Sequence, residues 1–362
     1  MKDTNWLMPL GHKNNFHFNP SPRDFTVEEI PLYTFSGEGE HTILRVTKKG
    51  VSTWEFIDML STKNGIPRRE IGYAGLKDKN ALTIQYISIP SKYEDRVLDT
   101  PFDNCRVTKH SRHNNKLRIG HLKGNRFWLR FKKVLPLQKE MIESVLDYIE
   151  KEGMPNYFGN QRFGNSMDNW QKGKLISEGK LRLKDRRMRT FLLSAWQSYL
   201  FNSWLSKRVQ MCRLLQSFKY SEVESILNLP KDTLQTTQKQ KQFFKILEGD
   251  ILMHYPYGKI FYAKEMDKEV DRFIQKDISI TGLIAGKKVK RAKEMAKVIE
   301  DMFDTKINEQ GSRRYGWIFL QDIDKKYIKE KAQYELSFYL PKGSYATVVV
   351  DMLRGEYGSC AI

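Results

Sequence analysis

The amino-acid sequence predicts an α+β protein with a mixed, largely antiparallel sheet and a second domain inserted into the first. Segments rich in β-branched and aromatic residues occur near both ends of the chain, whereas the middle carries mostly helical patterns. At 362 residues the chain is also longer than one hydrophobic core usually serves. If the C-terminal strands complete the N-terminal sheet, the chain divides into 1–152, 153–319 and 320–362, with the middle part inserted.

The first elements are expected to be two strands, a helix and a further strand. Phe25–Ile30 and Thr42–Thr47 have strand character and are separated by the polar turn at 36–40, which predicts a hairpin-like start. Ser52 followed by Glu55 is a capping-box pattern. A helix should begin there, because apolar residues then recur at helical spacing at Trp54, Ile57 and Leu60.

A charged loop at 75–85 is the most informative stretch of the chain. It lies between the strand-like segments 71–74 and 83–90, so Asp78 is held at both sides. An acid fixed between Lys77 and Lys79, with a glycine to turn the backbone, suits a group that must stay ionised and approach a substrate. The alternative is an Asx-type turn in which the aspartate only accepts hydrogen bonds from nearby backbone amides.

The segment from 104 to 139 contains no acidic residue and many basic ones. Within it, Asn125 begins a regular alternation that predicts a strand. One face would carry Asn125, Phe127, Leu129 and Phe131, and the other, wet and basic face would carry Arg126, Trp128, Arg130 and Lys132.

The remaining elements alternate between helical and strand patterns. An amphipathic helix is expected over 141–149 and should end at Gly153 and Pro155. The inserted part has helical spacing around 193–204 and 295–302, with strand-like pieces at 251–255 and 259–263. The tail is expected to form strands at Tyr334–Leu340 and Tyr345–Asp351, the second one central because of Val348, Val349 and Val350.

Composition restricts the possible partners. The formal net charge of +19 favours a polyanion, above all nucleic acid, because lysines and arginines displace counterions from phosphates. Three scattered cysteines and histidines without metal-ligand spacing predict neither a disulfide framework nor a metal site. The lack of a long apolar run or a signal peptide predicts a cytoplasmic protein with no membrane partner.

Several blocks of the sequence, together with the 75–85 loop, resemble the TruD family of tRNA pseudouridine synthases. They occur in the family's order from residue 22 to residue 347. The blocks are Pro22–Glu29, Gly37–His41, Lys116–Phe127, Pro155–Gly164, Leu193–Asn202 and Leu340–Thr347. Two positions depart from the family pattern at the N-terminal block, where Arg23 replaces a glutamate and Asn19 stands near an expected lysine. Tyr345 replaces a phenylalanine found in many members.

This resemblance implies the pseudouridine synthase fold for the first domain, which would be catalytic, and an inserted α/β TRUD domain at 153–319. It implies isomerisation of uridine to pseudouridine in tRNA, at position 13, without a cofactor. Asp78 would be catalytic, and the residues around the target uridine would be Phe25, Lys77, Asn125, Phe127 and Tyr345. The residues expected to contact the RNA backbone are Arg112, Lys116, Arg118, Lys123 and Arg162.

The residue types are compatible with that chemistry. A stacked uridine cannot be isomerised, so the base must be flipped out and placed on an aromatic surface with a polar group at its edge. A carboxylate can then act on C1′ as a nucleophile or on the sugar as a base. Lys77 would keep Asp78 ionised or contact a phosphate. The alternative for the aromatic residues is a role in the core, and Asn125 after a glycine can be a turn residue.

Two other functions remain open from the sequence. One is an RNA-binding or chaperone-like protein that has this fold and performs no catalysis. The other is a methyltransferase, although no nucleotide-cofactor motif follows a predicted strand. Gly282–Lys288 vaguely resembles a phosphate-binding loop, but it is one residue short and lacks the serine or threonine that would hold magnesium. The basic residues after it are either an RNA-phosphate patch or a solvated helix face.

Overall fold

The computed structural model describes residues 6–11, 13–77, 79–164 and 166–355, which form two compact units. We call Asn15–Glu140 with Leu320–Gly343 the strand-rich unit. We call Met1–Asn14, Met141–Phe319 and Ser344–Ile362 the helical unit. The expected division into catalytic and inserted parts at 1–152, 153–319 and 320–362 stays a prediction. The bounds of the two compact units differ from it.

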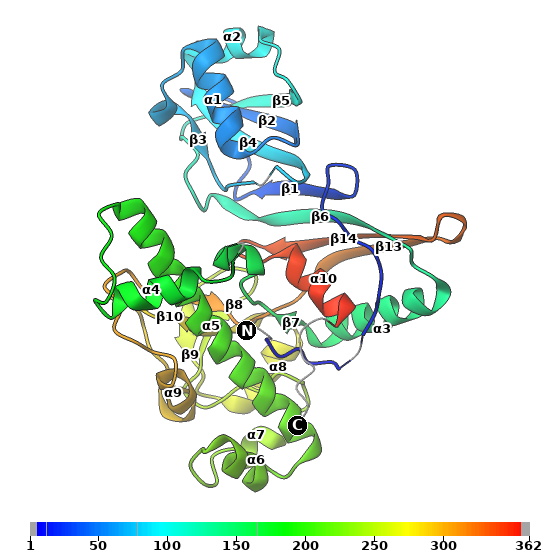
Figure 1. Cartoon of the computed structure of the whole chain (residues 1–362), viewed down its shortest axis with the longest axis vertical. Helices are drawn as coiled ribbons and strands as arrows, with labels where there is room; N and C mark the ends of the chain where they lie inside the picture. The colour runs from blue at the N-terminus through cyan, green and yellow to red at the C-terminus, as the bar shows by residue number, and fades with distance from the viewer. Residues whose placement is uncertain (1–5, 12, 78, 165, 356–362) are drawn as a thin grey trace. The chain divides into compact units, whose positions relative to one another are not determined.

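The strand-rich unit is built on an eight-stranded sheet (Figure 1). Its strands are β1 (Phe25–Pro31), β2 (His41–Lys49), β3 (Gly72–Tyr73), β4 (Leu82–Pro90), β5 (Cys105–His113), β6 (Leu122–Lys132), β13 (Gln321–Ile328) and β14 (Gln333–Pro341). The order is β13-β14-β6-β1-β4-β2-β5, with β3 on β4, and only β1 and β4 pair in parallel. The α+β class and the mixed, largely antiparallel sheet are therefore confirmed, and C-terminal strands complete the sheet.

The expected hairpin-like start is wrong. β1 pairs with β4 and β6, and β2 pairs with β4 and β5, so β4 lies between the first two strands. The polar turn at 36–40 was a correct sign of a chain reversal, but a turn does not determine which strand becomes the neighbour. The alternation in β4, with buried side chains on both sides near its end, suits a central strand.

Helix α1 (Thr53–Asn64) begins and ends as its sequence predicts. The Ser52 side chain accepts a hydrogen bond from the Glu55 amide, the Glu55 carboxylate accepts one from the Ser52 amide, and Gly65 closes the helix in the left-handed region at φ 69°. The apolar face of α1 packs on β2 and β4, and the helix lies across them in Figure 1. The short helix α2 (Glu94–Asp99) follows β4. This core fixes the position of the loop that follows β3.

The alternation expected in β6 is confirmed. Asn125, Phe127, Leu129 and Phe131 are buried, whereas Arg126 is exposed and the other side chains of that face are half-buried. Acidic partners occupy the basic face, however: Arg126 pairs with Asp322, Arg130 with Glu335, and Lys132 with Asp24. The positive charge of this face is therefore largely neutralised, so the face is poorly suited to binding phosphates.

The helical unit combines helices with two small sheets. The chain enters it within α3 (Pro136–Glu152), which Gly153 ends at φ 81°. Its further helices are α4 (Asn169–Ser177), α5 (Arg186–Ser217), α6 (Tyr220–Leu227), α7 (Gln235–Gln238), α8 (Met266–Ile274), α9 (Glu294–Asp301) and α10 (Ala346–Arg354). Strands β8 (Ile251–His254), β9 (Ile260–Tyr262), β10 (Ile278–Ile284) and β11 (Ser312–Tyr315) form one sheet, and β7 (Met154–Pro155) pairs with β12 (Trp317–Ile318).

The expected strand at Tyr345–Asp351 is wrong, because this segment forms helix α10. Three consecutive valines favour a strand by intrinsic propensity. The apolar residues Ala346, Val349, Val350 and Leu353 nevertheless recur at helical spacing, and all four are buried. Burial of that face in the helical unit outweighs the few tenths of a kcal/mol per valine that propensity costs in a helix. Gly355, at φ 70°, closes the helix.

Candidate active site

The loop that bears Asp78 is anchored at its start. Asp78 itself lies outside the described residues, so the structure is described for its neighbours. The Lys77 amide donates to Thr53 Oγ1 at 2.8 Å, and the Thr53 amide donates to the Lys77 carbonyl at 3.2 Å. Gln85 Nε2 donates to the Gly75 carbonyl at 2.6 Å, and its Oε1 accepts from Thr53 Oγ1 at 3.0 Å. The first turn of α1 and strand β4 therefore hold this backbone together.

The Lys77 side chain is buried and faces two polar partners. Its Nζ donates to Asn125 Oδ1 at 2.5 Å and lies 3.3 Å from Glu29 Oε2. The exposed fraction is 7% for the Lys77 side chain and 1% for that of Glu29. Burial raises the pKa of the Glu29 carboxyl from its ordinary value, and the Lys77 charge offsets part of that rise. Register places Glu29 directly opposite Asn125 across β1 and β6, which explains how one ammonium reaches both.

The contact with Lys77 also orients the Asn125 amide. An ammonium only donates hydrogen bonds, so the carbonyl oxygen of the amide must face Lys77. The amide NH₂ is then turned the other way, and no partner for it occurs among the described residues. A fixed pair of N–H donors can recognise a carbonyl oxygen at the edge of a base.

Three phenylalanine rings form a row on the same sheet. The rings of Phe25 and Phe127 are nearly parallel, at an interplanar angle of 6° with 6.1 Å between centroids. Phe338 follows on the other side of Phe127 at 5.5 Å. Phe338 and Phe127 are buried, at 0% and 6% exposed, whereas Phe25 is half-buried. Phe25 is therefore the ring of this row that is most open to a partner, and Phe127 mainly supports it.

Tyr345 belongs to the helical unit, where it is the N-cap residue of α10. Its ring lies 6.1 Å from that of Phe158, and the Arg314 guanidinium lies 4.0 Å from the Phe158 centroid and 5.8 Å from that of Tyr345. Burial lowers the pKa of Arg314 to about 10. A Cβ on Gly159 would lie 3.0 Å from Thr347 Oγ1, so this close approach favours glycine. Tyr345 is thus held by a cation–aromatic cluster.

Arg162 lies beside this cluster. Its guanidinium is 5.9 Å from the Phe158 centroid and donates to Ser194 Oγ at 2.9 Å and Ser198 Oγ at 3.3 Å. Tyr157 and Phe163 in the same block are buried. The block around Arg162 is therefore packed by its rings, with Arg162 half-buried above them.

The other residues expected to contact the RNA backbone lie in the strand-rich unit. Arg112 Nε donates to Glu94 Oε2 at 3.1 Å, which occupies part of its charge. Lys116 and Arg118 both line a cavity of about 460 Å³ together with Tyr33, His113 and His121. The Lys116 ammonium donates to the Arg69 carbonyl, and partial burial lowers the pKa of Lys116. Lys123 is half-buried on β6.

Glu29 is a residue of the site that the sequence analysis did not single out. It contacts Lys77 directly and is almost fully buried. A signal was present, because Phe25, Val27 and Glu29 share the inward face of β1, and a carboxylate at an inward position requires a buried partner. The partner of Glu29 is Lys77, which is far from it along the chain, so only the fold could identify it.

Within the described parts of the chain, no three His, Cys, Asp or Glu side chains are placed to hold a metal ion. None of the described helices is both long and apolar enough to cross a membrane.

Comparisons with known proteins identify the family of the chain. The family model described as tRNA pseudouridine synthase D (TruD) matches residues 15–184 and 178–352. Curated relatives named tRNA pseudouridine synthase D include one from Sulfurimonas denitrificans, which is 50% identical over 343 residues, covering 94% of this chain and 96% of the relative. Another from Wolinella succinogenes is 51% identical over 341 residues, covering 94% of each chain.

A more distant likeness concerns the fold alone. A TruD crystal structure from Methanosarcina mazei matches with a TM-score of 0.68 at 19% identity and covers 96% of this chain and 95% of its own. Nearly the whole chain thus agrees in sequence with curated relatives and in fold with a solved structure. The chain therefore belongs to the tRNA pseudouridine synthase D (TruD) family.

Proposed function

We propose that this chain is a tRNA pseudouridine synthase that converts uridine at tRNA position 13, in the cytoplasm, with Asp78 as its catalytic residue. Family membership and relatives at about half identity support the reaction and favour it over a non-catalytic RNA-binding role. One observation in the structure carries the assignment of the site. Lys77, the residue before Asp78, is buried and hydrogen-bonded to Asn125 on β6. The same strand carries Phe127, which stacks with Phe25.

The reaction is an isomerisation and balances without a co-reactant. The N1–C1′ bond of uridine breaks, the uracil turns, and a C5–C1′ bond forms. The proton at C5 is lost and N1 gains one, so the product has the composition of the substrate. Asp78 would act either as the nucleophile at C1′ or as a base on the sugar.

The geometry around Lys77 supports an internal role for this residue. Its ammonium is engaged by Asn125 and Glu29 and is nearly inaccessible, so a phosphate could reach it only by displacing them. We therefore assign Lys77 to holding the loop that bears Asp78, and not to the RNA backbone.

Asn125 and Phe25 would receive the flipped base. The Asn125 amide NH₂, oriented by Lys77, matches a uracil carbonyl, whereas the amino group at position 4 of cytosine is itself a donor. Phe25 offers a half-buried ring supported by Phe127, a suitable surface for the face of a base. Tyr345 stays a proposed substrate contact from the helical unit.

The deciding experiment compares the wild type with Asp78→Asn on purified tRNA. Pseudouridine is mapped by nucleotide position before and after incubation without added cofactor, and tRNA binding is measured in parallel. The wild type should convert uridine 13, whereas Asp78→Asn should lose conversion and retain binding. Conversion by the variant at the wild-type rate would remove Asp78 from the mechanism. Binding without conversion by the wild type would support the non-catalytic alternative.

A further inference from the structure

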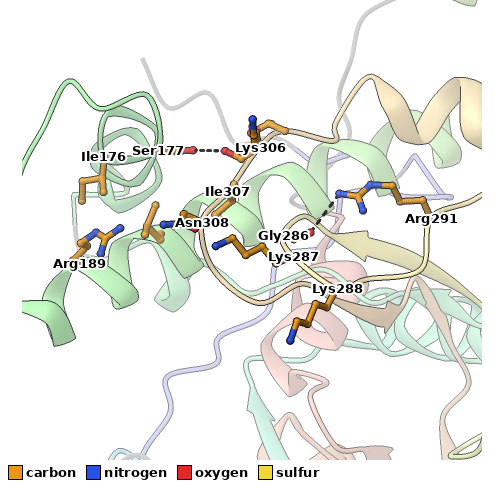
Figure 2. Close-up of a pocket in the computed structure, with 12 residues that line it drawn as sticks. Ile176, Ser177, Arg189, Gly286, Lys287, Lys288, Arg291, Lys306, Ile307 and Asn308 are labelled. Atoms are coloured by element: carbon orange, nitrogen blue, oxygen red, sulfur yellow. Dashed lines mark hydrogen bonds between the residues drawn. The ribbon is translucent and has the colours of Figure 1, made fainter.

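The helical unit contains a cavity of about 480 Å³ whose charged lining, among the described residues, is entirely cationic. Its walls come from the end of α4, the first turns of α5, the loop after β10 and the segment before β11. The basic residues that line it are Arg189, Lys287, Lys288, Arg291 and Lys306. Arg189 is far from the other four along the chain, and the fold brings it to the same space (Figure 2).

The backbone around the cavity is firmly held. The Lys287 amide donates to the Glu309 carbonyl at 2.8 Å, and the Gly311 amide donates to the Lys287 carbonyl at 2.9 Å. A Cβ on Gly286 would lie 2.6 Å from the Glu309 carbonyl oxygen and from the Gly311 nitrogen, so only glycine lets these two segments approach. On the other wall, Ser177 Oγ donates to the Lys306 carbonyl at 3.4 Å. The cationic side chains therefore project from a fixed frame.

Among the described residues, only one of the five cations has an acidic partner. Arg291 donates to Asp304 at 2.6 Å and also reaches the Gly286 carbonyl at 3.3 Å, as the dashed line in Figure 2 shows. No ion pair with a described residue engages the other four. In Figure 2, Lys287 extends toward Asn308 and Arg189, whereas Lys288 points away from them. Lys288 and Lys306 are both exposed. Several unpaired like charges around one cavity repel one another, and an anion in the cavity would relieve that repulsion.

The floor of the cavity is apolar. Ile176, Leu193 and Ile307 are 9%, 1% and 3% exposed and belong to the core between α4, α5 and β10. A cavity of this volume lies in the range of small-ligand sites and is large enough for more than a bare phosphate. Cationic side chains around an apolar surface suit a nucleotide, because the cations can contact its charged phosphate and its base or sugar can lie on the apolar surface.

We propose that this cavity binds one phosphodiester-linked nucleotide of the substrate RNA, other than the uridine that is isomerised. Its phosphates would contact Arg189 and Lys287, and its sugar or base would lie over Ile176 and Ile307. The inference rests on the proposed function, because it takes the partner of the chain to be RNA. An RNA strand also supplies the neighbouring phosphates that the exposed Lys288 and Lys306 can meet.

The test is a charge reversal with a matched control. The cavity variant is Arg189→Glu with Lys287→Glu, and the control variant is Lys231→Glu with Lys239→Glu, two exposed lysines of the same unit that change the net charge equally. The cavity variant should raise the KM for tRNA about tenfold with kcat unchanged. It should also flatten the salt dependence of tRNA affinity by between about 1 and 2 units of slope. The control variant should change neither the KM for tRNA nor the slope of the salt dependence by as much as about twofold.

Three outcomes decide the matter. Equal effects of the two variants on KM and salt slope would overturn the proposal, since general charge would then explain them. Tight binding of uridine monophosphate that the cavity variant abolishes, with tRNA affinity unchanged, would make the cavity a free-nucleotide site and also overturn it. Weaker tRNA binding by the cavity variant in a protein that never converts uridine would support the cavity and refute the proposed reaction instead. Arg189→Lys with Lys287→Arg, which keeps both positive charges, should retain tRNA binding and so separates lost charge from misfolding.

Discussion

Lys77 Nζ lies 2.5 Å from Asn125 Oδ1, and both side chains are more than nine-tenths buried. This contact connects the loop that bears Asp78 to the sixth strand of the sheet. Glu29 lies on another side of the same ammonium, at 3.3 Å. A single lysine therefore sets the orientation of an amide, neutralises a buried carboxylate and holds the start of the loop that bears Asp78, which makes it the most sensitive point of the proposed site.

Lys77→Met should destabilise the strand-rich unit as well as slow conversion. The substitution leaves the Glu29 charge buried without its partner, a situation that costs about 3 to 5 kcal/mol in other proteins. Chemical unfolding should therefore show a loss of that order, together with a fall in conversion of more than about tenfold. In the Lys77→Met background, Glu29→Gln should recover part of the stability, because it removes the unpaired charge. Additive losses in this double-mutant cycle would contradict direct coupling of the two residues.

Asn125→Asp combined with Glu29→Gln should separate folding from catalysis. The new carboxylate can still accept from Lys77 and replaces the buried charge removed at position 29, so the thermal midpoint should change little. It cannot donate, however, and it places negative charge against a uracil carbonyl. The loss of one donor at a buried site is worth about 1 to 3 kcal/mol, or about a 5- to 160-fold decrease in kcat/KM. Unchanged kcat/KM with a lowered midpoint would instead make Asn125 a purely structural residue.

Phe25→Leu and Phe127→Leu should have different consequences. Phe25 is half-buried, so its loss should mainly reduce affinity for the flipped base, by about 1 to 3 kcal/mol, and show as a fall in kcat/KM. Phe127 is 6% exposed and lies between two other rings, so its loss should mainly lower the free energy of unfolding. The two variants are compared by conversion kinetics and by urea titration. The reverse ranking would assign the base platform to Phe127.

Lys48 should make stability depend on pH in the alkaline range. Burial lowers its pKa from 10.5 to about 8, an effect that Lys77 strengthens and that Cys105, Glu29 and Glu55 partly oppose. Between these two pH values the unfolded chain binds a proton that the folded chain does not, so this group makes stability rise with pH across that window. Below about pH 8 the folded protein carries the full cost of burying the charge, of the order of 3 kcal/mol.

Lys48→Met isolates that contribution. The variant should be more stable than the wild type near pH 7, and its advantage should shrink by about 3 kcal/mol between pH 8 and 10.5. Urea titrations of both proteins at several pH values measure this difference while other titrating groups cancel. A constant difference across the window would show that Lys48 titrates normally in the folded protein.

Local patterns predicted the elements that depend on local rules. The capping box at Ser52 and Glu55 specified the start of α1, and the alternation from Asn125 specified the inward face of β6. Both follow from the geometry of neighbouring residues and need no distant partner. The same local view failed at 345–351, where β-branched residues suggested a strand and packing produced a helix. Intrinsic propensity is worth only tenths of a kcal/mol per residue there, and burial of four apolar side chains is worth several times more.

By itself the sequence determined the α+β class, the polyanionic partner, the family resemblance and the residues proposed for the site, because charge, periodicity and motif order are properties of the linear chain. Only the tertiary structure decided that Glu29 is the partner of Lys77, that acids neutralise the basic face of β6, and that Arg189 and Lys287 line one cavity. Those relationships join residues tens to hundreds of positions apart. No local rule brings such residues together, since their contact depends on the strand order and on how the helices pack.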